Sequence, residues 1–329
     1  MTIPFTPRVI VVGSLHVDLI ATVETLPGPG ESVIGSSFTT APGGKAGNQA
    51  AQVARCGVPA ALVGRVGDDA HGDLLREAYR TIGIDTGGIV VAAGGQTGAS
   101  TVLVDATGGY LSAIVPGTSA TWGRPGVAAT LGPFTAAAVL MVQGELPATI
   151  SLAAARWARE RGMTIVSNPS PAPSADDVPM RELVGSSDVV VINRQELDAL
   201  ALLFGVKPPR VERSDVYATA TALRTKVAGS RLIVTLGEDG AVMVDPSGVV
   251  AVAPYPGTTV VDTVGAGDAF LGAYVAGFVR GLATGSALRY AAVAASLSLR
   301  GRGALAAQAS HEAIVAATPR EATPWIRYR

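Results

Sequence analysis

Residues 260–270, "VVDTVGAGDAF", place an aspartate inside a glycine-rich turn that leads directly into an apolar helical pattern. Small residues at 265–267 allow the backbone to approach a ligand closely. The free N–H groups and the dipole at the start of a helix favour an anion there. Asp268 could simply cap the helix, but a cap requires neither Asp262 nor two glycines. We therefore interpret Asp268 as a general base beside an anion site.

Upstream of this turn, short apolar runs alternate with longer helical patterns. Continuous Val, Ile and Leu runs separated by amphipathic helices are typical of a mostly parallel sheet covered on both faces. Strands are predicted at residues 8–14, 60–67, 137–145, 163–169, 188–193 and 231–237. Helices are predicted at 46–57, 69–83, 148–161, 194–204, 215–228 and over most of 266–318. The sequence thus predicts an α/β fold with a doubly wound, mostly parallel sheet.

Two segments, residues 17–40 and 97–115, interrupt this alternation, because they show β-like alternation with no helix between their strands. The main pattern resumes on either side of each segment. We therefore predict a single domain, residues 1–329, that carries a small β-sheet lid formed by these two segments. Residues 319–329 are expected to be a loosely attached tail.

Composition and motif searches exclude several classes of function. Of the 329 residues, 48% are hydrophobic and 16% are charged, as in a packed globular protein. The net charge of −1 gives no electrostatic reason to expect nucleic acid or a membrane surface as a partner. Neither a Walker-type phosphate loop nor a dinucleotide-binding glycine motif is present. With the single Cys56 and no signal or membrane segment, we expect a cytoplasmic protein.

Other stretches place polar residues at predicted turns and strand ends. In "APGGKAGN" (41–48), two glycines precede a helix whose first turn carries a lysine and an asparagine. Asp18 follows a predicted strand, where ligands bind in open α/β sheets. In "INRQELDAL" (192–200), Asn193 and Glu196 share a helix face, which suits Mg²⁺ or equally a helix cap.

These motifs, in this order, closely resemble those of the ribokinase-like (PfkB) carbohydrate kinases, over about residues 8–317. The resemblance implies a ribokinase-like fold and transfer of the γ-phosphoryl group of Mg-ATP to a sugar hydroxymethyl group. The leading substrate that the resemblance implies is D-ribose, which would become ribose 5-phosphate. ATP, Mg²⁺, K⁺ as an activator and a homodimer formed through the β lid are also implied.

The resemblance also assigns roles to individual residues. It makes Asp268 the catalytic base, with an anion hole at Gly265, Ala266 and Gly267. The residues implied for sugar binding are Asp18, Gly44, Lys45, Asn48, Glu145 and Asp268. The residues implied for ATP binding are Asn193, Thr235, Gly237, Glu238, Gly240 and Gly267. The implied metal ligands are Glu196 for Mg²⁺ through water and, for K⁺, Asp262 with the carbonyls of Val264, Ser298, Gly301 and Gly303.

Three departures from the family pattern leave the substrate and the cation open. Ala46 and Gly47 are interchanged relative to the family's GGKGAN, and His16 stands where ribokinases carry Asn. The loop "SLRGRGALAAQAS" (298–310) also differs near the predicted K⁺ site. The alternatives are a kinase for fructose, deoxyribose, 2-keto-3-deoxygluconate or adenosine, or a non-catalytic sugar or nucleotide sensor of the same fold.

Overall fold

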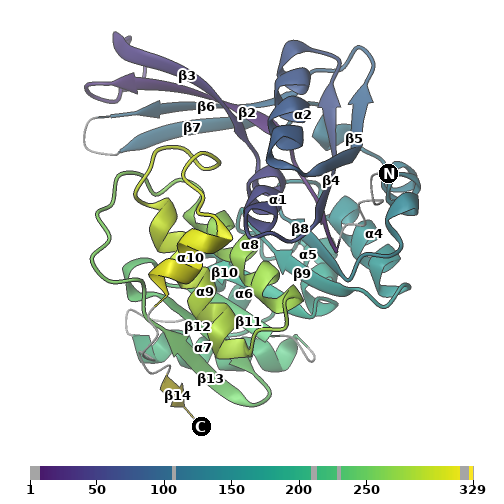
Figure 1. The fold of residues 1–329 in the computed structure, drawn as a ribbon, viewed down its shortest axis with the longest axis vertical. Helices are drawn as coiled ribbons and strands as arrows, with labels where there is room; N and C mark the ends of the chain where they lie inside the picture. Colours follow the sequence, from purple (N-terminus) through teal and green to yellow (C-terminus); the bar gives the residue numbers. More distant parts are fainter. Residues whose placement is uncertain (1–7, 106–108, 209–212, 228–230, 319–325, 329) are drawn as a thin grey trace.

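The computed structural model describes residues 8–105, 109–208, 213–227, 231–318 and 326–328, and it has a large helix-covered sheet and a smaller sheet (Figure 1). The strands are β1 (Val9–Val12), β2 (His16–Val23), β3 (Gly35–Gly43), β4 (Ala60–Gly67), β5 (Asp85–Ala92), β6 (Gly98–Val104), β7 (Tyr110–Val115), β8 (Val139–Gln143), β9 (Thr164–Asn168), β10 (Val189–Asn193), β11 (Arg231–Thr235), β12 (Ala241–Asp245), β13 (Gly248–Val252) and β14 (Ile326–Tyr328). The α-helices are α1 (Lys45–Arg55), α2 (Ala70–Ile82), α3 (Arg124–Leu131), α4 (Ala148–Arg159), α5 (Val178–Gly185), α6 (Arg194–Leu203), α7 (Arg213–Lys226), α8 (Ala266–Val279), α9 (Thr284–Ser298) and α10 (His311–Ala317).

The large sheet has ten strands in the order β14-β13-β12-β11-β10-β9-β8-β1-β4-β5. All neighbours from β5 through β11 are parallel, and the pairs from β11 to β14 are antiparallel. The six strands predicted from apolar runs are all present in it. The predicted α/β fold with a mostly parallel sheet is therefore confirmed.

Helices cover both faces of this sheet because its strands are apolar on both sides. Successive strand residues point to opposite faces. In β1, Val9 and Val11 pack in the core that includes α1, α2, α8, α9 and α10, whereas Ile10 and Val12 pack in the core that includes α3 to α7. Within the described ranges, no helix is long and apolar enough to cross a membrane.

The smaller sheet is the predicted lid. Its four strands lie in the order β3-β2-β6-β7, with β2 antiparallel to β3, β6 antiparallel to β7, and β2 parallel to β6. It projects away from the helix-covered body, while β3 leads straight into α1 (Figure 1). The predicted small sheet is therefore present, whereas its action as a lid and the single-domain organisation stay predictions. Residues 106–108 of the predicted range lie outside the described residues.

Some elements differ from the sequence prediction. The sequence analysis missed β5, β13, α3 and α5. The two helices have only eight residues each, so their periodicity is hard to detect. The expectation of a loosely attached tail was wrong for residues 326–328, since β14 pairs with β13. The other tail residues, 319–325 and 329, lie outside the described residues.

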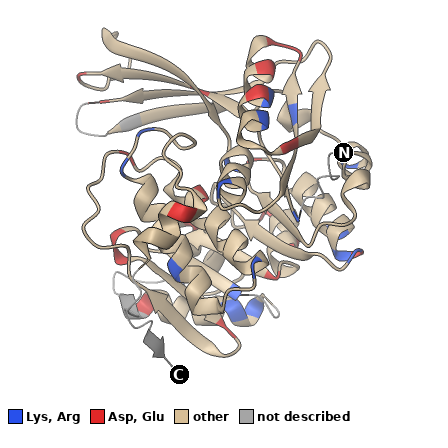
Figure 2. Ribbon diagram, viewed as in Figure 1, with Lys and Arg blue, Asp and Glu red and all other residues tan. Residues whose placement is uncertain are grey.

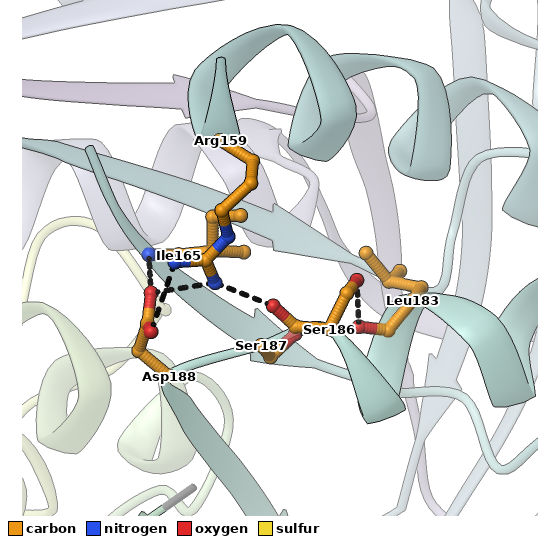
Figure 3. Close-up of polar contacts among 6 residues, drawn as sticks. All are labelled: Arg159, Ile165, Leu183, Ser186, Ser187 and Asp188. Atoms are coloured by element: carbon orange, nitrogen blue, oxygen red, sulfur yellow. Dashed lines mark hydrogen bonds and ion pairs between the residues drawn. The ribbon is translucent and has the colours of Figure 1, made fainter. Parts of the chain in front are cut away.

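One ion pair joins α4 to the amino ends of two central strands (Figure 3). The guanidinium of Arg159 contacts both carboxylate oxygens of Asp188, at 3.1 and 3.0 Å, and donates to the carbonyl oxygen of Ser186 at 2.6 Å. Asp188 Oδ2 also accepts from the backbone N–H of Ile165 at 2.7 Å. The two parallel contacts between Arg159 and Asp188, with the bond from Ile165, fix the amino ends of β9 and β10.

Replacing Arg159 by Ala is expected to lower the free energy of unfolding by about 1 kcal/mol, because the lost pair is bidentate but about half exposed. Urea denaturation measures the change. Arg80→Ala is the matched control, since Arg80 pairs with Glu77 on an exposed face of α2 and should change stability little. An equal loss in both variants would contradict a structural role for the Arg159–Asp188 pair.

Candidate active site

Polar residues gather at the carboxyl ends of the central strands, and Glu145, which the sequence analysis named, is among them. Ser14 follows β1, Glu145 follows β8, and Asn168 ends β9. β1 and β8 are neighbours at the centre of the large sheet. The next strand of this sheet after β1 is β4, which pairs with the edge of β1 away from β8, whereas the next strand after β8 is β9, which pairs with the edge of β8 away from β1. Open α/β sheets bind ligands at such a switch point. The candidate site therefore lies between β1 and β8, below the lid.

Asp268 lies in the first turn of α8 and is only 7% exposed. Asn48 Nδ2 donates to Asp268 Oδ2 at 3.1 Å, and Gln49 Nε2 donates to Asp268 Oδ1 at 2.9 Å. Burial raises the pKa of Asp268; the Lys45 charge and the two amide donors oppose this, and the Glu145 charge adds to it. The aspartate thus sits beside three polar residues of the "GGKAGNQ" stretch.

The turn before Asp268 approaches other parts of the chain closely. Gly265 has a φ of +78°, and a Cβ there would lie 2.5 Å from Ala304 Cβ, so only glycine fits. The N–H of Ala266 donates to Thr263 O at 3.3 Å, whereas the N–H of Gly267 has no acceptor among the described residues. A free N–H at the start of an α-helix favours an anion.

Asp18 faces the glycine pair that precedes α1. A Cβ on Gly43 would lie 2.4 Å from Asp18 Oδ2, so a glycine here leaves the carboxylate its space. Gly44 is the residue that caps α1. His16, which is 5% exposed, lies with Nε2 at 3.4 Å from Asp18 Oδ1. The structure therefore brings Asp18, the glycine pair and the atypical His16 together.

Glu145 lies against the start of α1. Its Oε2 accepts from the backbone N–H of Lys45 at 2.9 Å and also from the hydroxyl of Ser14. The sequence analysis named Glu145 and Lys45 but not Ser14. A serine after a buried strand gives no distinctive signal, and only the pairing of β1 with β8 brings it to Glu145.

Buried amides behind Asp268 were also missed. Gln49 Nε2 donates to Asn168 Oδ1 at 3.2 Å, and Gln49 Oε1 accepts from Gln143 Nε2 at 2.8 Å. Gln49 and Gln143 are 0% and 1% exposed. A signal existed, because Gln49 follows Asn48 on a helix that is otherwise rich in small apolar residues. These amides fix the side chain that holds Asp268.

Asn193 and Glu196 form a helix cap. Asn193 Oδ1 accepts from the N–H of Glu196 at 2.9 Å, and Glu196 Oε2 accepts from the N–H of Asn193 at 2.8 Å. Of the two interpretations that the sequence left open, the cap is thus present. Asn193 and Thr235 lie in register at the ends of β10 and β11. The turn that follows β11 contains Gly237, Glu238 and Gly240.

The segments predicted to bind K⁺ are in contact. Asp262 accepts from the N–H groups of Val264 at 3.0 Å and Gly303 at 2.8 Å. Ser298 O accepts from the N–H of Gly301 at 3.5 Å. Among the described residues, no group of three or more His, Cys, Asp or Glu could hold a metal ion. A cation at this position would therefore need backbone carbonyl ligands as well as Asp262.

Comparison with known proteins identifies the family. The pfkB family carbohydrate kinase model matches residues 6–310. The chain belongs to this family. A ribokinase of Arabidopsis thaliana is 30% identical over 314 residues, covering 94% of this carbohydrate kinase and 80% of the relative. The similarity to this ribokinase therefore covers nearly the whole chain.

Solved structures agree with this family assignment. The structure of A. thaliana ribokinase complexed with ribose and ATP has a TM-score of 0.83 at 26% identity, covering 96% of this kinase and all of that chain. A Cryptococcus neoformans ribokinase in complex with ADP has a TM-score of 0.81 at 27% identity, covering 94% of this kinase and 99% of that chain. The ribokinase-like fold is thereby confirmed.

Gly265→Ala is expected to destabilise the kinase by about 2 kcal/mol, because the new methyl group would overlap Ala304 and the backbone has a positive φ. Gly267→Ala is the matched control. A Cβ on Gly267 meets no atom within 4 Å, and alanine favours the helix, so this variant should be at least as stable as the wild type. Thermal melting of both variants tests the prediction, and equal melting temperatures would contradict it.

Proposed function

We propose that this chain is an ATP-dependent ribose kinase that transfers the γ-phosphoryl group of Mg-ATP to the hydroxymethyl group of D-ribose, giving ribose 5-phosphate. The family supports the reaction class. The name and bound ligands of the A. thaliana relative support ribose and ATP as substrates. The observation that carries the proposal is the buried carboxylate of Asp268, held by two amides at the start of α8.

Asp268 is the proposed base. Its carboxylate accepts the hydroxymethyl proton while the sugar oxygen bonds to the γ-phosphorus and the bond to ADP breaks. The raised pKa of Asp268 makes it a stronger base than an ordinary aspartate. The N–H groups of Gly265, Ala266 and Gly267 are proposed to hold the charge of the transferring group. The N–H of Gly267, for which the described part of the chain provides no acceptor, supports this role.

The sugar is proposed to bind between the lid base, α1 and the end of β8. Two contacts across the site support this position: Lys45 with Glu145, and Asn48 with Asp268. Carboxylates and amides at converging positions suit the hydroxyl groups of a polyol. The residues proposed to bind the sugar are Asp18, Gly44, Lys45, Asn48, Glu145 and Asp268.

ATP is proposed to lie along the ends of β10 and β11. When bound, Mg²⁺ supplies positive charge to the phosphate groups. Glu196 is 5% exposed and one of its oxygens already accepts within the helix cap, which fits contact with Mg²⁺ through water better than direct ligation. The residues proposed to contact ATP are Asn193, Thr235, Gly237, Glu238, Gly240 and Gly267.

K⁺ is proposed to bind beside the anion turn, where it would stabilise the turn's conformation. The contacts of Asp262 with both segments support this site. Carbonyl ligands do not depend on side-chain identity, so the unusual 298–310 loop is compatible with it. The proposed ligands are Asp262 and the carbonyls of Val264, Ser298, Gly301 and Gly303.

A homodimer through the lid is also proposed. The lid strands carry almost no charged residues, as Figure 2 shows. Phe38, Leu111 and Val115, which share one face of these strands by register, are 49–68% exposed. A sheet face of this kind favours a partner surface. The cytoplasmic location expected from the sequence stays a prediction.

Another sugar, or a nucleoside, is the second candidate substrate. His16 supports it, because the imidazole is buried directly beside Asp18, within the proposed sugar site. An imidazole has a larger volume than the amide that the family pattern has there. It can therefore change which hydroxyl arrangement fits next to Asp18.

Asp268→Asn is expected to lower kcat for ribose phosphorylation by about a thousandfold, because the amide cannot accept the proton. Binding of ribose should persist, because the amide keeps the shape of the carboxylate. ADP release measured in a coupled assay gives kcat, and the ribose-dependent rise in melting temperature gives binding. A variant as active as the wild type would contradict the role of Asp268.

The same assay separates the candidate functions. Ribose, deoxyribose, fructose, 2-keto-3-deoxygluconate and adenosine are compared with Mg-ATP, each in K⁺ and in Na⁺. Preference for ribose with higher rates in K⁺ is the expected result. Preference for another substrate would overturn ribose but not the kinase reaction. Binding without turnover of any substrate would favour the sensor.

The pH dependence of kcat/KM tests the environment of Asp268. The base must be ionised, so activity should fall as the pH drops through its raised pKa. Gln49→Met removes a donor to the carboxylate, which raises that pKa further and moves the acid limb up by about one pH unit. Gln52→Met is the control, because Gln52 is equally buried but bonds Cys56 and Ala309 instead. An unmoved acid limb in Gln49→Met would contradict the assignment.

A further inference from the structure

Gly47 lies inside α1, where glycine destabilises a helix relative to alanine. A Cβ at this position would lie 2.0 Å from Tyr79 Oη and 2.5 Å from Tyr79 Cζ, which is far closer than van der Waals contact. Ala46, the preceding residue, is fully buried on the side of α1 that faces Gly13. The order Ala46-Gly47 therefore leaves the space that Tyr79 occupies on α1.

Tyr79 uses this space to reach the turn before α1. It lies on α2 and is fully buried, and its hydroxyl donates to Gly43 O at 3.1 Å. Burial raises the pKa of Tyr79, and the Asp18 and Glu145 charges add to this, so the phenol stays a neutral donor. In Figure 1, α2 stands next to α1, at the base of the lid.

The turn that accepts the hydrogen bond from Tyr79 is also held by contacts on either side of it. Gly43 lies against the Asp18 carboxylate, and the residue after Gly44, Lys45, donates its backbone N–H to Glu145 at 2.9 Å. The carbonyl of Gly43 is thus fixed by Tyr79 on one side, while the start of α1 is fixed by Glu145 on the other.

We propose that Tyr79 is a positioning residue for substrate, which sets the Gly43–Gly44 turn against Asp18 and requires glycine at position 47. This inference rests on the proposed function, because it takes the turn and Asp18 as parts of the sugar site. It also explains the interchange of Ala46 and Gly47: a tyrosine at position 79 excludes a side chain at position 47.

The first test removes only the hydroxyl. In Tyr79→Phe, the KM for ribose should rise about fivefold, the effect of one lost hydrogen bond, because the turn loses its donor. The kcat and the KM for Mg-ATP should stay within about twofold of the wild type. Tyr290→Phe is the matched control, since it removes a buried hydroxyl that bonds His311, away from the site. An unchanged KM for ribose in Tyr79→Phe would overturn the positioning role.

The second test measures the coupling of the two positions without any substrate. Gly47→Ala should lower the melting temperature by about 4 °C, since the methyl group overlaps the tyrosine ring. In a Tyr79→Leu background, Gly47→Ala should leave the melting temperature unchanged or raise it, because the tyrosine ring is absent and alanine favours the helix. Gly185→Ala is the control, because a Cβ there meets no atom within 4 Å. An equal loss in both backgrounds would overturn the coupling.

The results of the two tests distinguish failure of this inference from failure of the proposed function. If the wild type does not phosphorylate ribose, the proposed function fails, while the melting temperatures still test the contact between positions 47 and 79. If the wild type is active and Tyr79→Phe keeps its KM for ribose, the inference fails alone. If Gly47→Ala does not fold by itself, the Gly47→Ala/Tyr79→Leu double variant must fold for the inference to stand.

Discussion

The site depends on the burial of one carboxylate, that of Asp268. Burying an ionised group costs several kcal/mol unless hydrogen-bond donors replace the lost water. Here Asn48 and Gln49 supply donors from α1, and the positive end of the α8 dipole adds to them. Donors and acceptor lie on different helices, so α1 and α8 must pack closely. Gly272 permits this, since a Cβ there would lie 2.6 Å from a side-chain atom of α1.

The rest of the site follows from where parallel strands end. β1 and β8 are neighbours, so the residues after them, Ser14 and Glu145, meet at one edge of the sheet. β3 of the lid leads straight into α1, which places Asp18 and the glycine pair beside the same edge. One helix start thus contacts the lid, the strand ends and Asp268. Movement of the lid would therefore act directly on the proposed sugar site.

Several motif residues satisfy local backbone groups as well as their proposed roles. Glu196 completes a helix cap, and Asp262 accepts from two backbone N–H groups. Such contacts hold a side chain in one orientation before a ligand arrives, which reduces the ordering cost of binding. A cap and a metal contact through water are therefore compatible uses of the same carboxylate.

The sequence alone determined the α/β fold, the lid and the ordered motifs, because strand periodicity and glycine turns are local features. It also singled out Asp268, since the acid follows its glycine turn directly. Only the tertiary structure decided the partners: Gln49 meets Asp268 across 219 positions, and Ser14 meets Glu145 across 131. It also decided that Gly47 must lack a side chain, because the ring that excludes one comes from α2. Such contacts arise from packing between distant segments, and a local pattern does not encode them.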